Sequence, residues 1–406
     1  MYKKSKTSQG ITVISNALSF YQSVTLGVWV KTGSRFERTG QMGMAHFIEH
    51  MLFKGTQKRT GQEIVLTLEQ HGANLNAFTS REQTCFYIQT PASFLEPAVE
   101  VLADMLTASR FSVTDIETER QVILEEIAAV EDTPDEYVVD LFQEHLFPGN
   151  TLGHPILGTR ESVAAHSRAG LTAFWRENYV AENMVVVAAG QLDHQALHDW
   201  VERYFTGENR PVPVETGMSA AVADQGRLFE HQSGFTQTHI CCGAAVCAAA
   251  DEQRFALEAL HVYLGAGMSS RLFQLMREEN AMVYSVYSFP EFFSDTGIFC
   301  IYLGTDGSKS ARALDLLKSE LECLVRDGID RDTLERVKQQ MRGRLMLSLE
   351  STYNRMIRLA KNEILFGRAY EPETIYRRID KLRTADIIKT AHDYFNFEDW
   401  IITKLQ

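Results

Sequence analysis

Two histidines and a glutamate stand at a spacing that suits metal chemistry in the segment His46-Phe47-Ile48-Glu49-His50. On a helix, positions i, i+3 and i+4 lie on one face, so the side chains of His46, Glu49 and His50 converge. Two imidazoles one turn apart can bind a single Zn²⁺ ion at about 2.0–2.1 Å. A carboxylate beside them can take a proton from a metal-bound water molecule, whose pKa the metal lowers to about 7. This inverted form of the His-Glu-x-x-His zinc helix predicts metal-dependent hydrolysis.

A catalytic zinc ion usually has three protein ligands, and a downstream acidic segment offers the third. A capping box, Thr114–Glu117, predicts that a helix begins there. Glu119 and Glu126 lie two turns apart on an apolar face of this helix, whereas Glu125 lies on a polar face. A carboxylate among apolar neighbours needs a partner to offset its desolvation, and a metal ion is such a partner. We therefore predict Glu126 as the third ligand and Glu119 as an auxiliary acid behind the ligands.

The elements that position these residues alternate between strands and helices. Apolar alternation predicts a strand over 23–31 and a hairpin pair over 75–90, and helical spacing predicts helices over 42–53 and 61–70. Two longer helices and a closing strand at 184–188 follow. Hairpin-paired strands with clustered helices favour an α+β sandwich over a doubly wound parallel sheet.

The same pattern recurs in the second half of the chain. A shift of about 216 residues aligns the closing strand with a strand at 400–403. A proline- and glycine-containing run between the halves is typical of a surface linker. We predict a tandem duplication with an N-terminal domain at 1–206, a linker at 207–226 and a C-terminal domain of the same fold at 227–406.

The second copy lacks the metal motif. At shifts of 215 to 216 residues His46 aligns with His261, but the remaining positions of the motif do not align with metal-binding side chains: Glu49, His50 and Glu126 fall on Leu264, Gly265 and Arg342. We therefore expect the metal in the N-terminal domain alone.

These residues together resemble the M16 peptidases, a family that includes pitrilysin, insulin-degrading enzyme and the mitochondrial processing peptidase. Glu126 lies 76 residues beyond His50, and the resemblance covers nearly the whole chain, as in the short two-domain branch of the family. It implies two homologous α/β-sandwich domains of the metallohydrolase type shared by LuxS and the processing peptidases. It also implies one Zn²⁺ per chain held by His46, His50 and Glu126, with Glu49 as the general base and Glu119 as a second glutamate.

Two further segments strengthen the resemblance. The first, 72–87, resembles the edge strand with which the family binds its substrate as an added β-strand. It supplies the substrate-binding residues that we predict, Asn76, Ala77, Phe78 and Glu82. Without the resemblance, a simple polar hairpin is the alternative interpretation.

The second segment contains Arg277 and Tyr284. In the family, an arginine and a tyrosine at this spacing hold the substrate backbone and the developing oxyanion, a role that suits their donor groups. From the residues alone, a surface arginine and a core tyrosine are an alternative. Because the chain has only two domains, the resemblance implies a homodimer in which Arg277 and Tyr284 of one chain complete the zinc site of the other.

We therefore expect a zinc metalloendopeptidase that hydrolyses unfolded or extended peptides inside a dimer chamber, with Glu49 as the general base. Two alternatives stay open. One is a non-catalytic peptide-binding or scaffold subunit of the same family, although such subunits typically have a damaged metal motif. The other is a zinc hydrolase of small molecules, which would leave the edge strand unexplained.

Composition restricts the partners and the location of the protein. The 406 residues carry a formal net charge of −13, which argues against nucleic acid and anionic membranes as general partners. We find neither an apolar run of the ~18 residues typical of a membrane helix nor a secretory signal, so we expect a cytoplasmic protein with reduced cysteines.

Residues 111–145 contain eleven carboxylates and one arginine, and basic peptides are favoured if part of this region faces the substrate. Histidines such as His71 and His145 receive no role.

Overall fold

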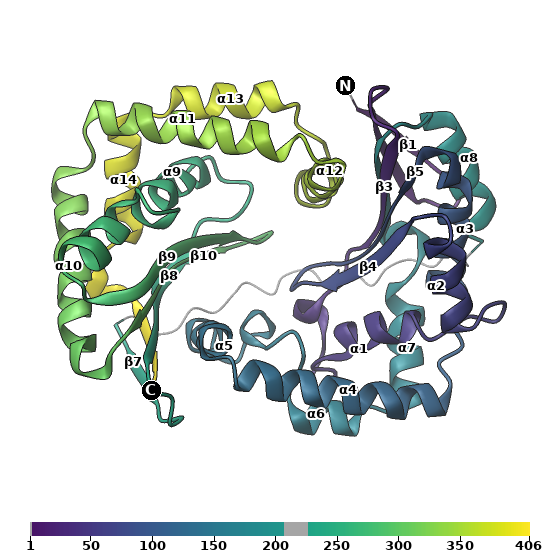
Figure 1. Cartoon of the computed structure of the whole chain (residues 1–406), viewed down its shortest axis with the longest axis horizontal. Coiled ribbons are helices and arrows are strands. Elements are labelled where there is room, and N and C mark those ends of the chain that lie inside the picture. Colours follow the sequence, from purple (N-terminus) through teal and green to yellow (C-terminus); the bar gives the residue numbers. More distant parts are fainter. Residues whose placement is uncertain (1, 207–225) are drawn as a thin grey trace. The chain divides into compact units, whose positions relative to one another are not determined.

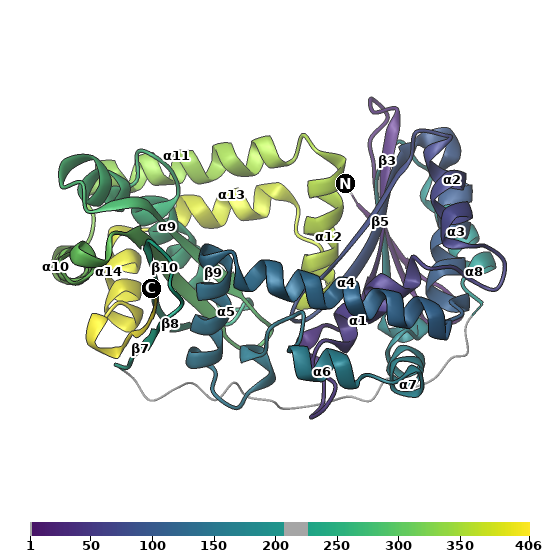
Figure 2. The ribbon, with the colours of Figure 1, turned by 60° about the horizontal axis from the view of Figure 1, so that its bottom comes forward.

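The computed structural model describes residues 2–206 and 226–406. These residues form two compact units, and each unit contains one mixed β-sheet covered by helices on both faces (Figures 1 and 2). Unit 1 comprises the described parts of Met1–Ala128, His154–Gly217 and Leu347–Tyr370. Unit 2 comprises the described parts of Ala129–Gly153, Met218–Met346 and Glu371–Gln406. The α+β class expected from the sequence is confirmed.

The sheet of unit 1 has six strands in the order β1-β2-β6-β3-β5-β4. Their bounds are Lys3–Lys6 (β1), Thr12–Ala17 (β2), Ser23–Val30 (β3), Asn74–Thr79 (β4), Thr84–Pro91 (β5) and Met184–Gly190 (β6). β2 and β6 run parallel, and the other neighbouring strands run antiparallel. β3 and β6 are buried nearly throughout, which explains their continuous apolar sequences, whereas β4 forms a partly exposed edge.

One face of this sheet packs against the helices of the N-terminal half. They are α1 (Met44–Leu52), α2 (Gly61–Glu69), α3 (Leu95–Ala108), α4 (Val113–Glu131), α6 (Arg160–Ala165), α7 (Arg168–Asn178) and α8 (His194–Tyr204). Their apolar side chains and those of the sheet form one continuous core. The opposite face packs against α12 (Thr352–Phe366) (Figure 1). Met356 and Leu359 of α12 share a cluster with Trp29 of β3.

The sheet of unit 2 has five strands in the order β7-β11-β8-β10-β9. Their bounds are Leu228–His231 (β7), Thr238–Val246 (β8), Val283–Phe292 (β9), Gly297–Thr305 (β10) and Ile401–Leu405 (β11). β7 and β11 run parallel, and the other pairs run antiparallel. Strand for strand, this order repeats β2-β6-β3-β5-β4 of unit 1, including its parallel pair. The repetition agrees with the predicted duplication.

Helices also cover both faces of the second sheet. On one face are α9 (Arg254–Gly265), α10 (Ser310–Asp327), α11 (Arg331–Ser348), α13 (Pro372–Lys381), α14 (Thr384–Tyr394) and a π-helical segment, Phe273–Glu279. On the other face is α5 (Pro134–Leu146), whose Val138 and Phe142 are fully buried against the sheet.

Each unit takes one helix from the other half of the chain. α5 precedes β6 in the sequence but packs on β8 and β11 of unit 2, and α12 follows α11 but packs on β3 and β6 of unit 1. The predicted domain ranges, 1–206 and 227–406, follow the duplication in the sequence. They differ from the two compact units because they assign α5 to the first domain and α12 to the second. The predicted linker, 207–226, lies outside the described residues except for Gly226.

The start of α4 differs from the sequence prediction. The helix begins at Val113, and the hydroxyl of Ser112 accepts a hydrogen bond from the backbone N–H of Asp115 at 3.1 Å and donates one to its carboxylate at 2.5 Å. The capping box predicted from Thr114 is therefore wrong. Two overlapping Ser/Thr-x-x-acid patterns occur here, and the earlier one starts the helix.

Glu37 fixes the first turn of α1. Its two carboxylate oxygens accept hydrogen bonds from the backbone N–H groups of Gly43 and Ala45, each at 2.8 Å. Glu37 is 2% exposed, and Gly43 has a φ of 86° and no side chain with which to cap the helix. The carboxyl group of Glu37 therefore satisfies two N–H groups at the start of the helix that would otherwise lack partners, while burial raises its pKa to about 8.

Above about pH 8, where the carboxyl group of Glu37 is ionised, we expect Glu37→Gln to lower the free energy of unfolding by about 1–3 kcal/mol, because the amide places a donor against one of these N–H groups. Urea unfolding measures the loss. Glu63→Gln is the matched control, since Glu63 belongs to an exposed capping box with Thr60 at the start of α2, and its loss should be smaller. Equal losses for the two variants would contradict the role given to Glu37.

All six cysteines are free, and four of them are buried in the sheets: Cys85, Cys241, Cys242 and Cys300. Among the described helices, none combines the length and the apolar character needed to cross a lipid bilayer.

Candidate metal centre

The amphipathic character of α1 determines where its polar side chains lie. Phe47, Ile48, Met51 and Leu52 are buried in the core of unit 1. Their packing turns the opposite face of the helix, which carries His46, Glu49 and His50, away from the core. The imidazole rings of His46 and His50 lie side by side with centroids 4.6 Å apart, as the i, i+4 spacing predicts.

Glu126 of α4 completes a group of three potential ligands. Its Oε2 lies 3.7 Å from Nε2 of His46 and 3.5 Å from Nε2 of His50. Among the described residues, these three form the one group of His, Cys, Asp or Glu side chains whose ligand atoms all lie within 4.8 Å of one another. Its neighbour Glu125 is exposed, in agreement with the choice of Glu126 from the helix periodicity.

The donor set fits a zinc ion. Two ligands at 2.0–2.1 Å from a tetrahedral ion are about 3.3–3.4 Å apart, close to the observed 3.5 and 3.7 Å. Two imidazoles and one carboxylate are also the donors of a catalytic zinc site, which keeps its fourth position open for substrate or water. These three side chains would therefore hold the ion.

Glu119 stands behind His50 and orients it. Its Oε2 lies 3.0 Å from Nδ1 of His50, and its Oε1 lies 2.5 Å from Nζ of Lys54. With Nδ1–H donating to this carboxylate, Nε2 of His50 presents its lone pair toward Glu126. Burial raises the pKa of Glu119, but the hydrogen bonds from His50 and Lys54 outweigh it, so its pKa lies below the ordinary value. Glu119 is thus ionised at neutral pH.

Glu49 lies beside the potential ligands with its carboxylate held by the edge strand. The hydroxyl of Thr79, the last residue of β4, donates to Oε2 of Glu49 at 2.5 Å. Burial raises the pKa of Glu49, whereas this hydrogen bond and the charge of His50 lower it, and the balance is a raised pKa. A carboxylate whose pKa is raised toward neutrality is a better general base than an ordinary glutamate.

The two histidines differ in how readily they accept protons. Burial and the neighbouring His50 lower the pKa of His46 to about 3. Burial also lowers the pKa of His50, but the hydrogen bond to Glu119 and the charge of Glu126 outweigh it and raise the pKa above its ordinary value. His46 therefore stays neutral and able to bind a metal down to acidic pH, whereas His50 does not.

The predicted substrate strand is the outer strand of the first sheet. β4 pairs with β5 on one side and is the last strand of the order, so its other side is not used within that sheet. Asn76 is exposed on it, and Phe78 packs edge-on against Trp29. Glu82 lies in the turn after β4, where its carboxylate accepts a hydrogen bond from Arg35 at 2.7 Å.

The predicted substrate-binding roles of Asn76, Ala77, Phe78 and Glu82 stay predictions. The same is true of Arg277 and Tyr284, which belong to unit 2. Tyr284 is 64% exposed on β9, the edge strand of the second sheet, and the guanidinium of Arg277 stacks on Phe273 at 4.9 Å.

Sequence reasoning missed three residues that support the site: Lys54, Thr79 and Arg35. Lys54 follows the last turn of α1, Thr79 ends a strand, and Arg35 pairs with Glu82. None of the three belongs to a spacing pattern that includes the metal motif. A buried carboxylate does require partners, and this requirement was the one signal that could have led to them.

Sequence relatives cover nearly the whole chain. An uncharacterized zinc protease of Mycobacterium bovis is 36% identical over 386 residues, which span 94% of this chain and 88% of the relative. An uncharacterized zinc protease of Bacillus subtilis is 34% identical over 402 residues, which span 99% of this chain and 97% of the relative. Residues 12–160 match the family Insulinase (Peptidase family M16), and residues 166–341 match the peptidase M16 inactive domain. The chain belongs to peptidase family M16.

The three potential ligands all lie within the first M16 match, and the segment predicted to lack a metal motif lies largely within the second. Solved structures show the same fold at low sequence identity. A protease from Helicobacter pylori has a TM-score of 0.93 at 20% identity, over 100% of this chain and 99% of that one. A structure described as a peptidase M16 inactive domain from Pseudomonas fluorescens has a TM-score of 0.92 at 18% identity, over 100% and 98%.

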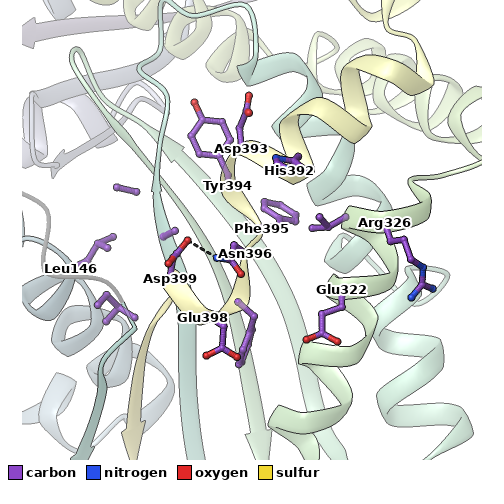
Figure 3. A pocket seen from close by; sticks show the side chains of 15 residues that line it. Leu146, Glu322, Arg326, His392, Asp393, Tyr394, Phe395, Asn396, Glu398 and Asp399 are labelled. Atoms are coloured by element: carbon purple, nitrogen blue, oxygen red, sulfur yellow. Dashed lines mark hydrogen bonds between the residues drawn. The ribbon is translucent and has the colours of Figure 1, made fainter.

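A cavity of about 540 Å³ lies elsewhere, within unit 2 (Figure 3). It is lined by residues of α10, α14 and the segment that leads into β11. Asn396, one of its polar side chains, donates a hydrogen bond to Asp399 at 2.7 Å. Among the described residues, none of the predicted site residues lines this cavity, and we assign it no function.

We expect the Kd for zinc to rise about tenfold for each pH unit below the pKa of His50, because one proton must leave for the metal to bind. One proton is expected because His46 does not titrate until about pH 3. Glu119→Gln removes the interaction that raises the pKa of His50. In this variant, the pH below which zinc affinity declines should be lower than in the wild type, and the zinc affinity at pH 8 should be about 10–100-fold weaker. Zinc titration between pH 5 and 8 measures both, with Glu125→Gln as the control. A two-proton slope would contradict the assignment.

Proposed function

We propose that this protein is a zinc-dependent endopeptidase that hydrolyses extended peptides. The observation that carries the proposal is the convergence of His46, His50 and Glu126 on one point, with the carboxylate of Glu49 on the same face of α1. The name zinc protease given to relatives that cover nearly the whole chain supports the same activity.

Zn²⁺, when bound, supplies a Lewis acid that polarises the scissile carbonyl and acidifies water. Glu49 takes the proton from the attacking water and delivers it to the leaving amine. Thr79 holds the carboxylate of Glu49 in one orientation for this transfer. Glu119 keeps Nδ1 of His50 protonated, so that Nε2 is the ligand atom.

The substrate adds to the edge of β4 as a further strand. Backbone groups on the outer side of β4 bind any extended peptide with little regard to its side chains. Asn76, Ala77 and Phe78 lie along this strand, and Glu82 acts through Arg35 to hold the turn that follows it. The strand leads directly to Thr79 and Glu49, so a peptide on β4 passes the proposed base.

Arg277 and Tyr284 bind the substrate backbone and stabilise the oxyanion. Their exposure supports the availability of both donors, since Tyr284 is 64% exposed and the side chain of Arg277 is 47% exposed. We propose that the protein is a homodimer with an enclosed chamber and that these residues serve the metal centre of the partner chain.

Basic peptides are the favoured substrates, because eleven carboxylates and a single arginine lie within residues 111–145. A lower KM for a Lys/Arg-rich peptide than for a neutral one of equal length, with the difference lost at high salt, is the expected behaviour.

The alternative function is a non-catalytic peptide-binding subunit of the same family. The match of residues 166–341 to an inactive-domain model is the observation in its favour. It concerns a segment that contains none of His46, Glu49, His50 or Glu126, so we favour the peptidase.

Glu49→Gln should retain zinc and lower kcat by about 10²–10⁴-fold, because it removes the general base and no ligand. His50→Ala and Glu126→Ala should lose both zinc and activity. Elemental analysis and cleavage of a quenched peptide measure the two properties separately, and Glu125→Ala is the control. Near-normal cleavage by a zinc-loaded Glu49→Gln protein would refute the mechanism, and wild-type protein that holds zinc but cleaves no peptide would favour the non-catalytic alternative.

Mixed dimers test the assignment of Arg277 and Tyr284 to the partner chain. Glu49→Gln and Tyr284→Phe chains, each weakly active alone, should regain up to about a quarter of wild-type activity when they are unfolded together and refolded, because statistical mixing leaves some sites with both residues intact. If activity does not exceed that of the parents although mixed dimers form, the two residues do not act in trans.

A further inference from the structure

Two histidines with no part in the proposed reaction meet in unit 2. His145 lies in the last turn of α5, and His231 is the last residue of β7. Their Nε2 atoms are 3.4 Å apart, and their ring centroids are 5.1 Å apart. Both residues are half-buried.

The separation of the two nitrogens suits a shared metal ion. Two imidazole nitrogens at 2.0–2.1 Å from a tetrahedral ion are about 3.3–3.4 Å apart, which matches the observed 3.4 Å. An N–H···N hydrogen bond between neutral rings is the other use of this geometry, although 3.4 Å is longer than the 2.7–3.2 Å range of common N–H···O bonds.

The surroundings of His145 hold its ring in place. Its Nδ1 lies 2.8 Å from the hydroxyl of Thr403, a fully buried residue of β11. With Nδ1–H donating to Thr403, Nε2 carries the lone pair and faces His231. The ring also stacks on Phe229, with centroids 3.8 Å apart and planes at 5°. A ring that is oriented in advance loses little freedom on binding a metal.

The helix that carries His145 is acidic, which favours a cation. α5 contains four carboxylate residues and neither lysine nor arginine: Asp135, Glu136, Asp140 and Glu144. Burial, and then the nearby His231, lower the pKa of His145 to about 4. The imidazole of His145 is therefore neutral at physiological pH, which is the state that binds metals.

We propose that His145 and His231 form a second metal site, separate from the centre at His46 and His50, for a divalent cation that prefers imidazole, such as Zn²⁺, Cu²⁺ or Ni²⁺. Two protein ligands leave the remaining positions to solvent, so this site binds more weakly than the three-ligand centre. The ion links α5 to β7 within unit 2. Because binding requires α5 in place on the sheet, an occupied site stabilises this packing.

The test uses Cu²⁺ as the probe in the full chain with His46→Ala and His50→Ala, which removes the first centre. We expect one Cu²⁺ per chain, with electron paramagnetic resonance showing coupling to imidazole nitrogen. Adding His231→Gln should raise the Kd for Cu²⁺ at least tenfold and remove this coupling. Thr403→Val should weaken binding and Thr403→Ser should preserve it.

The matched control is His71→Gln. His71 also stacks on a phenylalanine, Phe94, with centroids 4.0 Å apart, and its Nδ1 lies 3.2 Å from a backbone oxygen. Its contacts with Phe94 and with the backbone oxygen of Thr67 include no second imidazole, so copper binding should be unchanged. Absence of bound Cu²⁺ at 100 μM in the double variant, or an unchanged Kd after His231→Gln in a protein with an intact circular dichroism spectrum, would overturn the proposal.

Discussion

The carboxylate of Glu119 is the interaction on which the metal centre depends. It is 3% exposed, and it can remain ionised in that position only because His50 and Lys54 both donate to it. Both donors belong to α1 or to the residues just after it, so the contact sets how far along α4 the two helices meet. Glu126, two turns further along α4, is thereby placed against the Nε2 atoms of the histidines. A single buried charge thus determines both the orientation of one potential ligand, His50, and the position of another, Glu126.

A single hydrogen bond likewise connects the proposed base to the edge strand. Thr79 ends β4 and donates to Glu49, so the strand proposed to receive the peptide and the group proposed to move the proton share one hydrogen bond. Arg35 and Glu82 hold the turn beyond it. Displacement of β4 therefore alters the orientation of Glu49 without a change in any ligand of the metal.

The two sheets explain why the chain exchanges helices between its halves. Their central strands are apolar on both faces, and a sheet of this kind requires cover on both sides. Most helices of each unit cover one face of its sheet, and α12 or α5 covers the other. Because each of these helices comes from the opposite half of the sequence, neither half contains all the apolar surface that its own sheet needs.

Much of this could be predicted from the sequence, and the limits have a physical origin. Local periodicity determined that His46, Glu49 and His50 share a helix face, that Glu126 and not Glu125 points inward, and that two α+β repeats follow one another. These properties depend on neighbours within a few turns or on internal similarity, both of which a sequence contains. Tertiary structure decided the contacts between distant segments. These are the hydrogen bond from Thr79 to Glu49, the ion pair of Lys54 with Glu119, the exchange of α5 and α12, and the approach of His231 to His145. Each joins residues distant along the chain, and an apolar helix face or a polar side chain does not specify which distant surface it will contact.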